Sequence, residues 1–168
     1  MDFGLLLARL VFGLLMAAHG AQKLLGWFGG YGIAGTAGFF EALGFKPGRL
    51  FAVVASSAEL TGGLLVAAGL LGPLGPAAML AVMVVAAGSV HWQHGLFAMS
   101  NGIEVPLLYA TAAAALGLVG PGAYSLDRLL GLTQVWTPTI VWGVLVLGLA
   151  GGAVNLMVRR PAASAPAA

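Results

Sequence analysis

Long stretches almost free of charged residues dominate this 168-residue sequence. Lysine, arginine, aspartate and glutamate together make up 7% of the chain, whereas about 25% of a soluble domain is charged. So few charges cannot cover a water-soluble globule, which excludes a soluble enzyme and a disordered protein. The net charge is only +2, without a basic stripe, which excludes a nucleic-acid binder. The absence of cysteine also excludes disulfides, thiolate metal sites and iron–sulfur clusters.

The apolar stretches are long enough to cross a membrane as helices. A helical span needs about 20 predominantly apolar residues, and the alternating pattern of a transmembrane barrel is absent. The sequence therefore predicts an all-α integral membrane protein, with a four-helix transmembrane bundle and a fifth transmembrane helix. The expected spans are residues 3–25, 50–71, 76–94, 103–119 and 137–158.

Short signals mark where spans begin and what lies between them. Thr137 followed by Pro138 is typical of a helix N-cap and first turn. Residues 26–49 carry apolar side chains at helical spacing, which predicts a short helix in the membrane interface. Residues 120–137 form a second interfacial segment, and the low-complexity tail 161–168 is expected to be disordered.

The basic residues predict an orientation. Five spans place the N-terminus on one side of the membrane, side A, and the C-terminal tail on the other, side B. Arg128 is the basic residue of the side-A segments. Side B carries Lys23, Lys46, Arg49, Arg159 and Arg160. Because cytoplasmic loops are enriched in lysine and arginine, side B is predicted to face the cytoplasm.

The first two predicted spans each carry an ionisable residue away from their side-B ends, and charged groups at such depths commonly mark function. Arg9 lies early in the first span and Glu59 near the middle of the second. Their depths differ by roughly the length of a side chain, so an ion pair between Arg9 and Glu59 is predicted. Two interpretations stay open: the pair fixes the register of the two helices, or it takes part in chemistry.

The remaining polar side chains are predicted to lie at the same end of the bundle, on side B. The first and third spans end on side B, the fourth begins there, and the segment 26–49 lies over the same ends. Antiparallel packing therefore predicts a binding site at this end of the bundle. Its expected members are His19, Lys23, Tyr31, Glu41, His91, His94, Asn101 and Glu104.

Simpler interpretations remain for the members of this cluster. His91 and His94 are also typical of residues at the membrane interface beside Trp92. Lys23 can extend its amine to the interface while its stem stays in the apolar region. The His-x-x-His spacing alone is too weak to predict a metal site, and none is predicted.

Several strings resemble a known family. They are "AHGAQKLLGWFGG" (18–30), "GIAGTAGFFEALGF" (32–45), "AELTGGLL" (58–65), "NGIEVPLL" (101–108) and "GPGAYSLD" (120–127). In this order they resemble the DoxX family of small bacterial membrane proteins. The resemblance implies a four-helix core over residues 1–128, in a multi-pass protein of the bacterial cell membrane. The interfacial segment and fifth helix over 129–160, predicted from the residues themselves, lie beyond that core.

The resemblance also implies a set of characteristic polar positions. The fourth-span motif departs from the expected pattern, since Val105 stands where an aromatic residue is expected after the glutamate. If that aromatic stacks on a ligand, this chain binds the ligand differently or not at all. The implied positions are Arg9, His19, Gln22, Lys23, Glu41, Glu59, Asn101, Glu104, Tyr124 and Asp127.

The family is named for its association with a terminal quinol oxidase, and its relatives include a thiosulfate:quinone oxidoreductase subunit. This implies a subunit of an inner-membrane oxidoreductase assembly that binds a quinone, or another small redox or anionic substrate, without a covalent link. The expected partners are the lipid bilayer, a redox protein and a second copy of the chain. Whether the chain catalyses a reaction stays open, and the alternative is a non-catalytic membrane scaffold or small-molecule carrier.

We expect three kinds of role within the side-B cluster. His19 is predicted to hydrogen-bond a quinone carbonyl, and Glu41 or Glu104 to accept or supply the accompanying proton. Lys23 is predicted to stabilise negative charge on a reduced quinone or on an anion such as thiosulfate.

Overall fold

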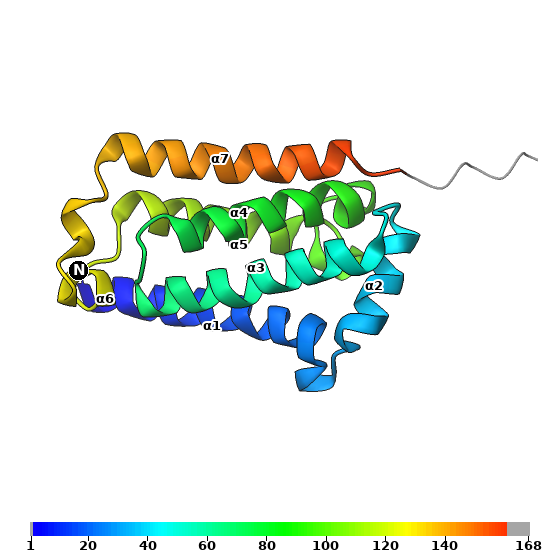
Figure 1. Ribbon diagram of the computed structural model, residues 1–168, viewed down its shortest axis with the longest axis horizontal. Coiled ribbons are helices and arrows are strands. Elements are labelled where there is room, and N and C mark those ends of the chain that lie inside the picture. Colours follow the sequence, from blue (N-terminus) through cyan, green and yellow to red (C-terminus); the bar gives the residue numbers. More distant parts are fainter. Residues whose placement is uncertain (1, 161–168) are drawn as a thin grey trace, which may run out of the picture.

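The computed structural model describes residues 2–160, and every regular element in that range is a helix (Figure 1). The predicted all-α membrane bundle is confirmed. The disorder expected for residues 161–168 lies outside the described residues. The long helices are α1 (Asp2–Leu25), α3 (Gly48–Ala68), α4 (Leu74–Ala86), α5 (Glu104–Val119) and α7 (Pro138–Met157).

Within residues 2–160, four helical stretches are long and apolar enough to cross a membrane: α1, α3, α7, and α4 together with its continuation to His94. That continuation is a π-helical turn (Ala87–His91) followed by a 3₁₀ turn (Trp92–His94). The fourth predicted span forms α5, whose 16 residues extend for about 24 Å. It is therefore shorter than the roughly 30 Å hydrocarbon core.

α1 and α3 lie against each other with glycines at their contact. A Cβ atom on Gly13 would lie 2.6 Å from the backbone nitrogen of Ala67, and one on Gly63 would lie 2.5 Å from that of Ala17. Small residues permit this approach, as is common between membrane helices. These contacts fix the antiparallel register of α1 and α3, and with it the depth of their polar side chains.

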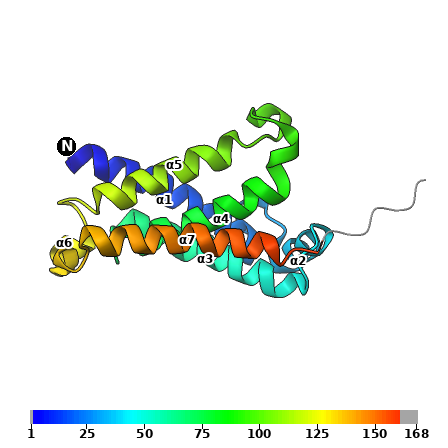
Figure 2. The same ribbon diagram turned by 90° about the horizontal axis from the view of Figure 1, so that it is seen from above.

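α7 lies along the outside of the bundle against α4 (Figures 1 and 2). Gly148 and Gly152 make the approach, since Cβ atoms there would lie 2.5 Å and 2.7 Å from the carbonyl oxygens of Ala77 and Ala81. Thr137 caps its first turn by accepting from the Ile140 nitrogen, with Pro138 next, as predicted. Only 11% of the apolar window of α7 is buried, so most of this helix is left to face lipid.

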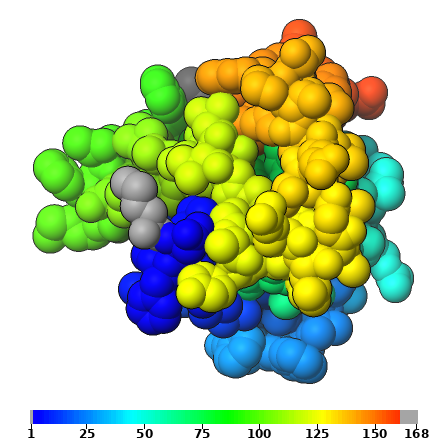
Figure 3. All heavy atoms as spheres, turned by 90° about the vertical axis from the view of Figure 1, so that its left-hand side faces the viewer, coloured from blue at the N-terminus to red at the C-terminus, as the bar shows by residue number. Residues whose placement is uncertain are grey.

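The interfacial segments lie at opposite ends of the bundle (Figures 1 and 2). At side B, residues 26–49 include the predicted short helix, α2 (Gly32–Ala42). The residues that follow α7 contact the turn that follows α2. Arg159 donates to the Leu43 carbonyl, and the Arg160 nitrogen donates to the Gly44 carbonyl. At side A, the segment after α5 includes the short helix α6 (Leu126–Leu129), and residues of this segment cover the end of the molecule beside the N-terminus (Figure 3).

Candidate functional site

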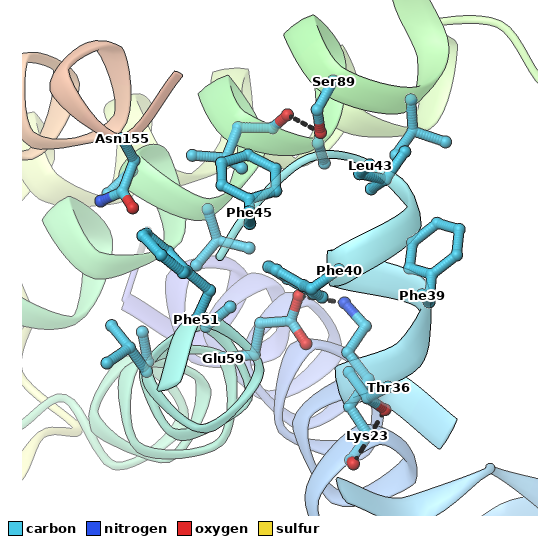
Figure 4. Close-up of a pocket in the computed structure, with 18 of the residues that line it drawn as sticks. Lys23, Thr36, Phe39, Phe40, Leu43, Phe45, Phe51, Glu59, Ser89 and Asn155 are labelled. Atoms are coloured by element: carbon cyan, nitrogen blue, oxygen red, sulfur yellow. Dashed lines mark hydrogen bonds and ion pairs between the residues drawn. The ribbon is translucent and has the colours of Figure 1, made fainter. Parts of the chain in front are cut away.

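A cavity of about 650 Å³ lies between α2, α3 and the end of α4, in the side-B half of the bundle. Its lining is mainly apolar and rich in phenylalanine (Figure 4). Phe39 and Phe40 come from α2, Phe51 comes from α3, and Phe45 from the turn between these helices is fully buried. The volume falls within the range of about 300–1,000 Å³ that is typical of small-molecule sites.

An ion pair joins Lys23 to Glu59 at this cavity (Figure 4). Lys23 lies in the last turn of α1 and its side chain is 38% exposed, whereas Glu59 lies on α3 and is 1% exposed. Lys23 Nζ donates to Glu59 Oε1. Glu59 Oε2 is buried and accepts no hydrogen bond from any residue in the range 2–160. The pair is the charged feature of an otherwise largely apolar lining.

Hydrogen bonds position α2 over this pair. Thr36 Oγ1 lies 3.0 Å from the carbonyl oxygen of Lys23 and 2.8 Å from that of Gly32, both of which accept from it. The first bond ties α2 to the last turn of α1, beside the lysine. Glu41 Oε1 accepts from the Gly48 nitrogen at 3.2 Å and thereby ties α2 to the first turn of α3.

The π-helical turn at the end of α4 forms another part of the wall. Ser89, Val90 and His91 from this turn line the cavity. Ser89 Oγ donates to the Val85 carbonyl at 2.6 Å, and His91 Nδ1 lies 2.7 Å from the Asn101 carbonyl oxygen. Single π-helical turns within α-helices are frequently found at functional sites.

The predicted Arg9–Glu59 ion pair is wrong. Arg9 donates instead to the carbonyls of Pro121 and Tyr124, the latter at 2.6 Å, with a weaker contact of 3.4 Å to Ala67. The register of the antiparallel helices explains the error, because Arg9 lies beside Gly69 at the end of α3. Glu59 is ten residues earlier in α3, which is about 15 Å along the axis.

Asp127 completes the side-A arrangement. Its buried carboxylate accepts from the nitrogens of Leu71 and Gly72, at 2.8 Å and 2.6 Å, and from Trp136 Nε1 at 2.8 Å. Its own nitrogen donates to the Gly69 carbonyl at 3.0 Å. The turn after α3 and the segment before α7 are thus held by one carboxylate, which indicates a structural role.

The predicted side-B cluster is only partly assembled. Lys23, Tyr31 and His91 line the cavity. His19 lies outside it, with its ring edge-on to that of Tyr109 at a centroid distance of 6.1 Å. The predicted role of His19 on a ligand carbonyl therefore has no support from this cavity.

The other expected members hydrogen-bond within their own segments and do not line the cavity. Glu104 Oε2 accepts from the Ala98 nitrogen at 2.7 Å, and His94 Nδ1 lies 2.9 Å from the Val90 carbonyl oxygen. Asn101 contributes its carbonyl to His91, as described above, and Glu41 ties α2 to α3. Packing of the loop between α4 and α5 on itself keeps Glu104 and His94 away from the lysine.

Several residues that line the cavity were not predicted from the sequence as members of the site. These are mainly the phenylalanines, whose enrichment in residues 26–49 was the available signal. Asn155, an isolated amide in the apolar helix α7, is another. Glu59 was identified as important, although with the wrong partner.

The DoxX family model matches residues 4–92, which is slightly more than half of the chain. The chain belongs to the DoxX family. The matched region extends from α1 through the π-helical turn and includes every cavity-lining residue except Asn155. It ends before His94, Asn101 and Glu104, three members of the side-B cluster that do not line the cavity. No curated protein and no solved structure matches the chain.

Proposed function

We propose that this DoxX-family membrane protein binds a quinone in the cavity beside α2, as a subunit of a membrane oxidoreductase assembly. The observation that carries the proposal is the Lys23–Glu59 ion pair in a cavity lined mainly by apolar and aromatic side chains. A quinone has the matching chemistry, because its ring is flat and apolar and its oxygens lie at the ring edge. Phenylalanine side chains suit the ring, and the ion pair suits the oxygens.

The two charged residues have complementary roles in this proposal. The Lys23 amine can donate a hydrogen bond to a ligand oxygen, and the Glu59 carboxylate can accept a proton from a ligand hydroxyl. Electron transfer to or from the ligand requires a second redox centre, which we assign to a partner protein in the assembly.

The charge balance favours a quinone over a small anion. Lys23 and Glu59 neutralise each other, and Glu59 is 1% exposed. An anion such as thiosulfate would be stripped of water next to a carboxylate, with no unpaired cation to compensate it. A neutral, lipid-soluble ligand avoids this cost.

The test is binding of a decyl-substituted benzoquinone to the purified chain in lipid nanodiscs. The informative variant is Ala58→Phe, since Ala58 lines the cavity next to Glu59 and a larger side chain there would fill it. Its matched control is Ala150→Phe on the exposed side of α7. We expect saturable binding to the wild type and the control, and at least about 10-fold weaker binding to Ala58→Phe.

Two results would contradict the proposal. One is the absence of saturable binding to the wild type, which would favour the scaffold or an unrelated carried solute. The other is equal affinity of the wild type and Ala58→Phe, which would place the quinone elsewhere on the protein.

A further inference from the structure

The cavity presents an acceptor without a donor. Three buried side-chain atoms within residues 2–160 have no hydrogen-bond partner: Arg9 Nε, Ser56 Oγ and Glu59 Oε2. Arg9 and Ser56 do not line the cavity, whereas Glu59 does. A buried acceptor without a partner is costly, typically by about 1–3 kcal/mol. A ligand in this cavity can therefore gain affinity by supplying a donor to Glu59 Oε2.

Three hydroxyl and amide side chains of the cavity lining donate to backbone carbonyls. The Thr36 and Ser89 hydroxyls donate to backbone carbonyls, and Asn155 Nδ2 donates to the Gly151 carbonyl at 3.3 Å. Lys23 Nζ donates to Glu59 Oε1. None of these groups donates to Glu59 Oε2, so a ligand hydroxyl would meet an open acceptor there.

We infer that the cavity prefers a neutral, lipid-soluble ligand that carries a hydroxyl group, and that this hydroxyl donates to Glu59 Oε2. The inference rests on the proposed function and specifies the form of the ligand: the quinol is favoured over the quinone. A quinone carbonyl is an acceptor only and would face the carboxylate oxygen without a proton between them. A quinol hydroxyl supplies that proton in a charge-assisted hydrogen bond.

The experiment compares three probes by calorimetric titration of the 168-residue chain in nanodiscs. The probes are a decyl benzoquinone, the corresponding quinol, and the dimethyl ether of that quinol, which keeps the ring and tail but has no donor. Dithionite keeps the quinol reduced. The chain contains no cysteine, so dithionite has no disulfide to reduce in it. We expect the quinol to bind about 10- to 100-fold more tightly than the other two probes.

Glu59→Gln tests the assignment to this carboxylate. The amide offers both a donor and an acceptor, so the preference for the quinol is expected to fall to about 3-fold or less. Glu104→Gln is the matched control, because it removes the same charge outside the cavity, where Glu104 accepts from the Ala98 nitrogen. This control is expected to keep the full preference.

The outcomes separate the two proposals. Equal affinity for quinol and quinone, or for quinol and its ether, would overturn the inference while leaving a quinone site in place. A full preference retained in Glu59→Gln would also overturn it. If none of the three probes binds the wild type, both the inference and the proposed function fail. The comparison of quinol with ether on the wild type decides the inference even where Glu59→Gln does not fold.

Discussion

The two ends of this bundle use buried charge in different ways. At side A, Arg9 and Asp127 bond mainly to the backbone: Arg9 holds α1, and Asp127 holds the turn after α3, to the segment between α5 and α7. A cavity of about 210 Å³ lies there beside Trp136, with no charged side chain in its lining. At side B, Glu59 keeps one oxygen free of hydrogen bonds and lines a cavity about three times as large. Arg9 Nε at side A also lacks a hydrogen-bond partner, but Arg9 lines neither cavity. The contrast teaches that a buried charge indicates a ligand site when its open bonding position also faces a cavity.

The largest effect is expected from Asp127→Ala. The substitution removes the acceptor for the Leu71 and Gly72 nitrogens and for Trp136 Nε1. By analogy with the removal of one partner from a buried charged arrangement, we expect the free energy of unfolding to fall by about 3–5 kcal/mol. Denaturant titration of the protein in detergent measures this loss.

The matched control is Asp2→Ala, because Asp2 is exposed and accepts from the Ala123 nitrogen at 3.2 Å. Its loss is expected to be about 1 kcal/mol or less. Equal stability of the two variants would show that the side-A bonds do not hold the bundle together.

A smaller and unequal effect is expected from the two members of the side-B pair. Lys23→Met leaves the buried Glu59 carboxylate without its cation, so we expect a loss of about 3 kcal/mol. Glu59→Gln should lose only about 1 kcal/mol, because the amide has nearly the same shape and the half-exposed lysine can extend to the interface. Thermal unfolding of the two variants under identical conditions gives the comparison. If Glu59→Gln is the less stable of the two, the assigned environments of these residues are wrong.

The smallest effect is expected from Trp136→Phe at side A. The ring that packs against Gly72 is largely retained, and the hydrogen bond from Nε1 to Asp127 is lost. The expected loss of stability is about 1 kcal/mol, against almost none for Trp142→Phe, whose ring is 58% exposed. Because side A is distant from the cavity, quinone affinity should stay within about 2-fold of the wild type. A large change in affinity would mean that the two ends are coupled.

Much of the fold could be predicted because it depends on local patterns. The lengths of the apolar stretches predicted the long helices, and Thr137 with Pro138 marked the start of α7. The predicted span 103–119 agrees with α5 (Glu104–Val119) to within one residue. The fold of the loop between α4 and α5 was not predicted: backbone bonds from Ile103 and Glu104 to Gly95 and Leu96 close it on itself. Such bonds depend on the conformation of the loop rather than on hydropathy.

The glycine contacts between α1 and α3 explain the partner of Glu59. A Cβ on Gly20 would collide with the backbone of Leu60, so Glu59 lies near the turn of α1 that precedes Lys23. That register brings the lysine within reach and leaves Arg9 at the other end of α3. The cavity itself could not be predicted, because it depends on how α2 packs against α1 and α3, and no local pattern encodes that packing.

The central claim is that a lipid-soluble ligand occupies the cavity between α2, α3 and α4 beside Glu59. The most direct measurement is photo-crosslinking of the wild-type chain in nanodiscs with a benzoquinone that carries a diazirine on its ring, followed by mass spectrometry of the labelled peptides. The account predicts labels within residues 36–59 and 81–91, which contain much of the cavity wall, and their loss when untagged decyl benzoquinone is added in excess. Labels confined to the exposed side of α7 or to the side-A segment 120–137, or labels that excess ligand does not displace, would contradict it.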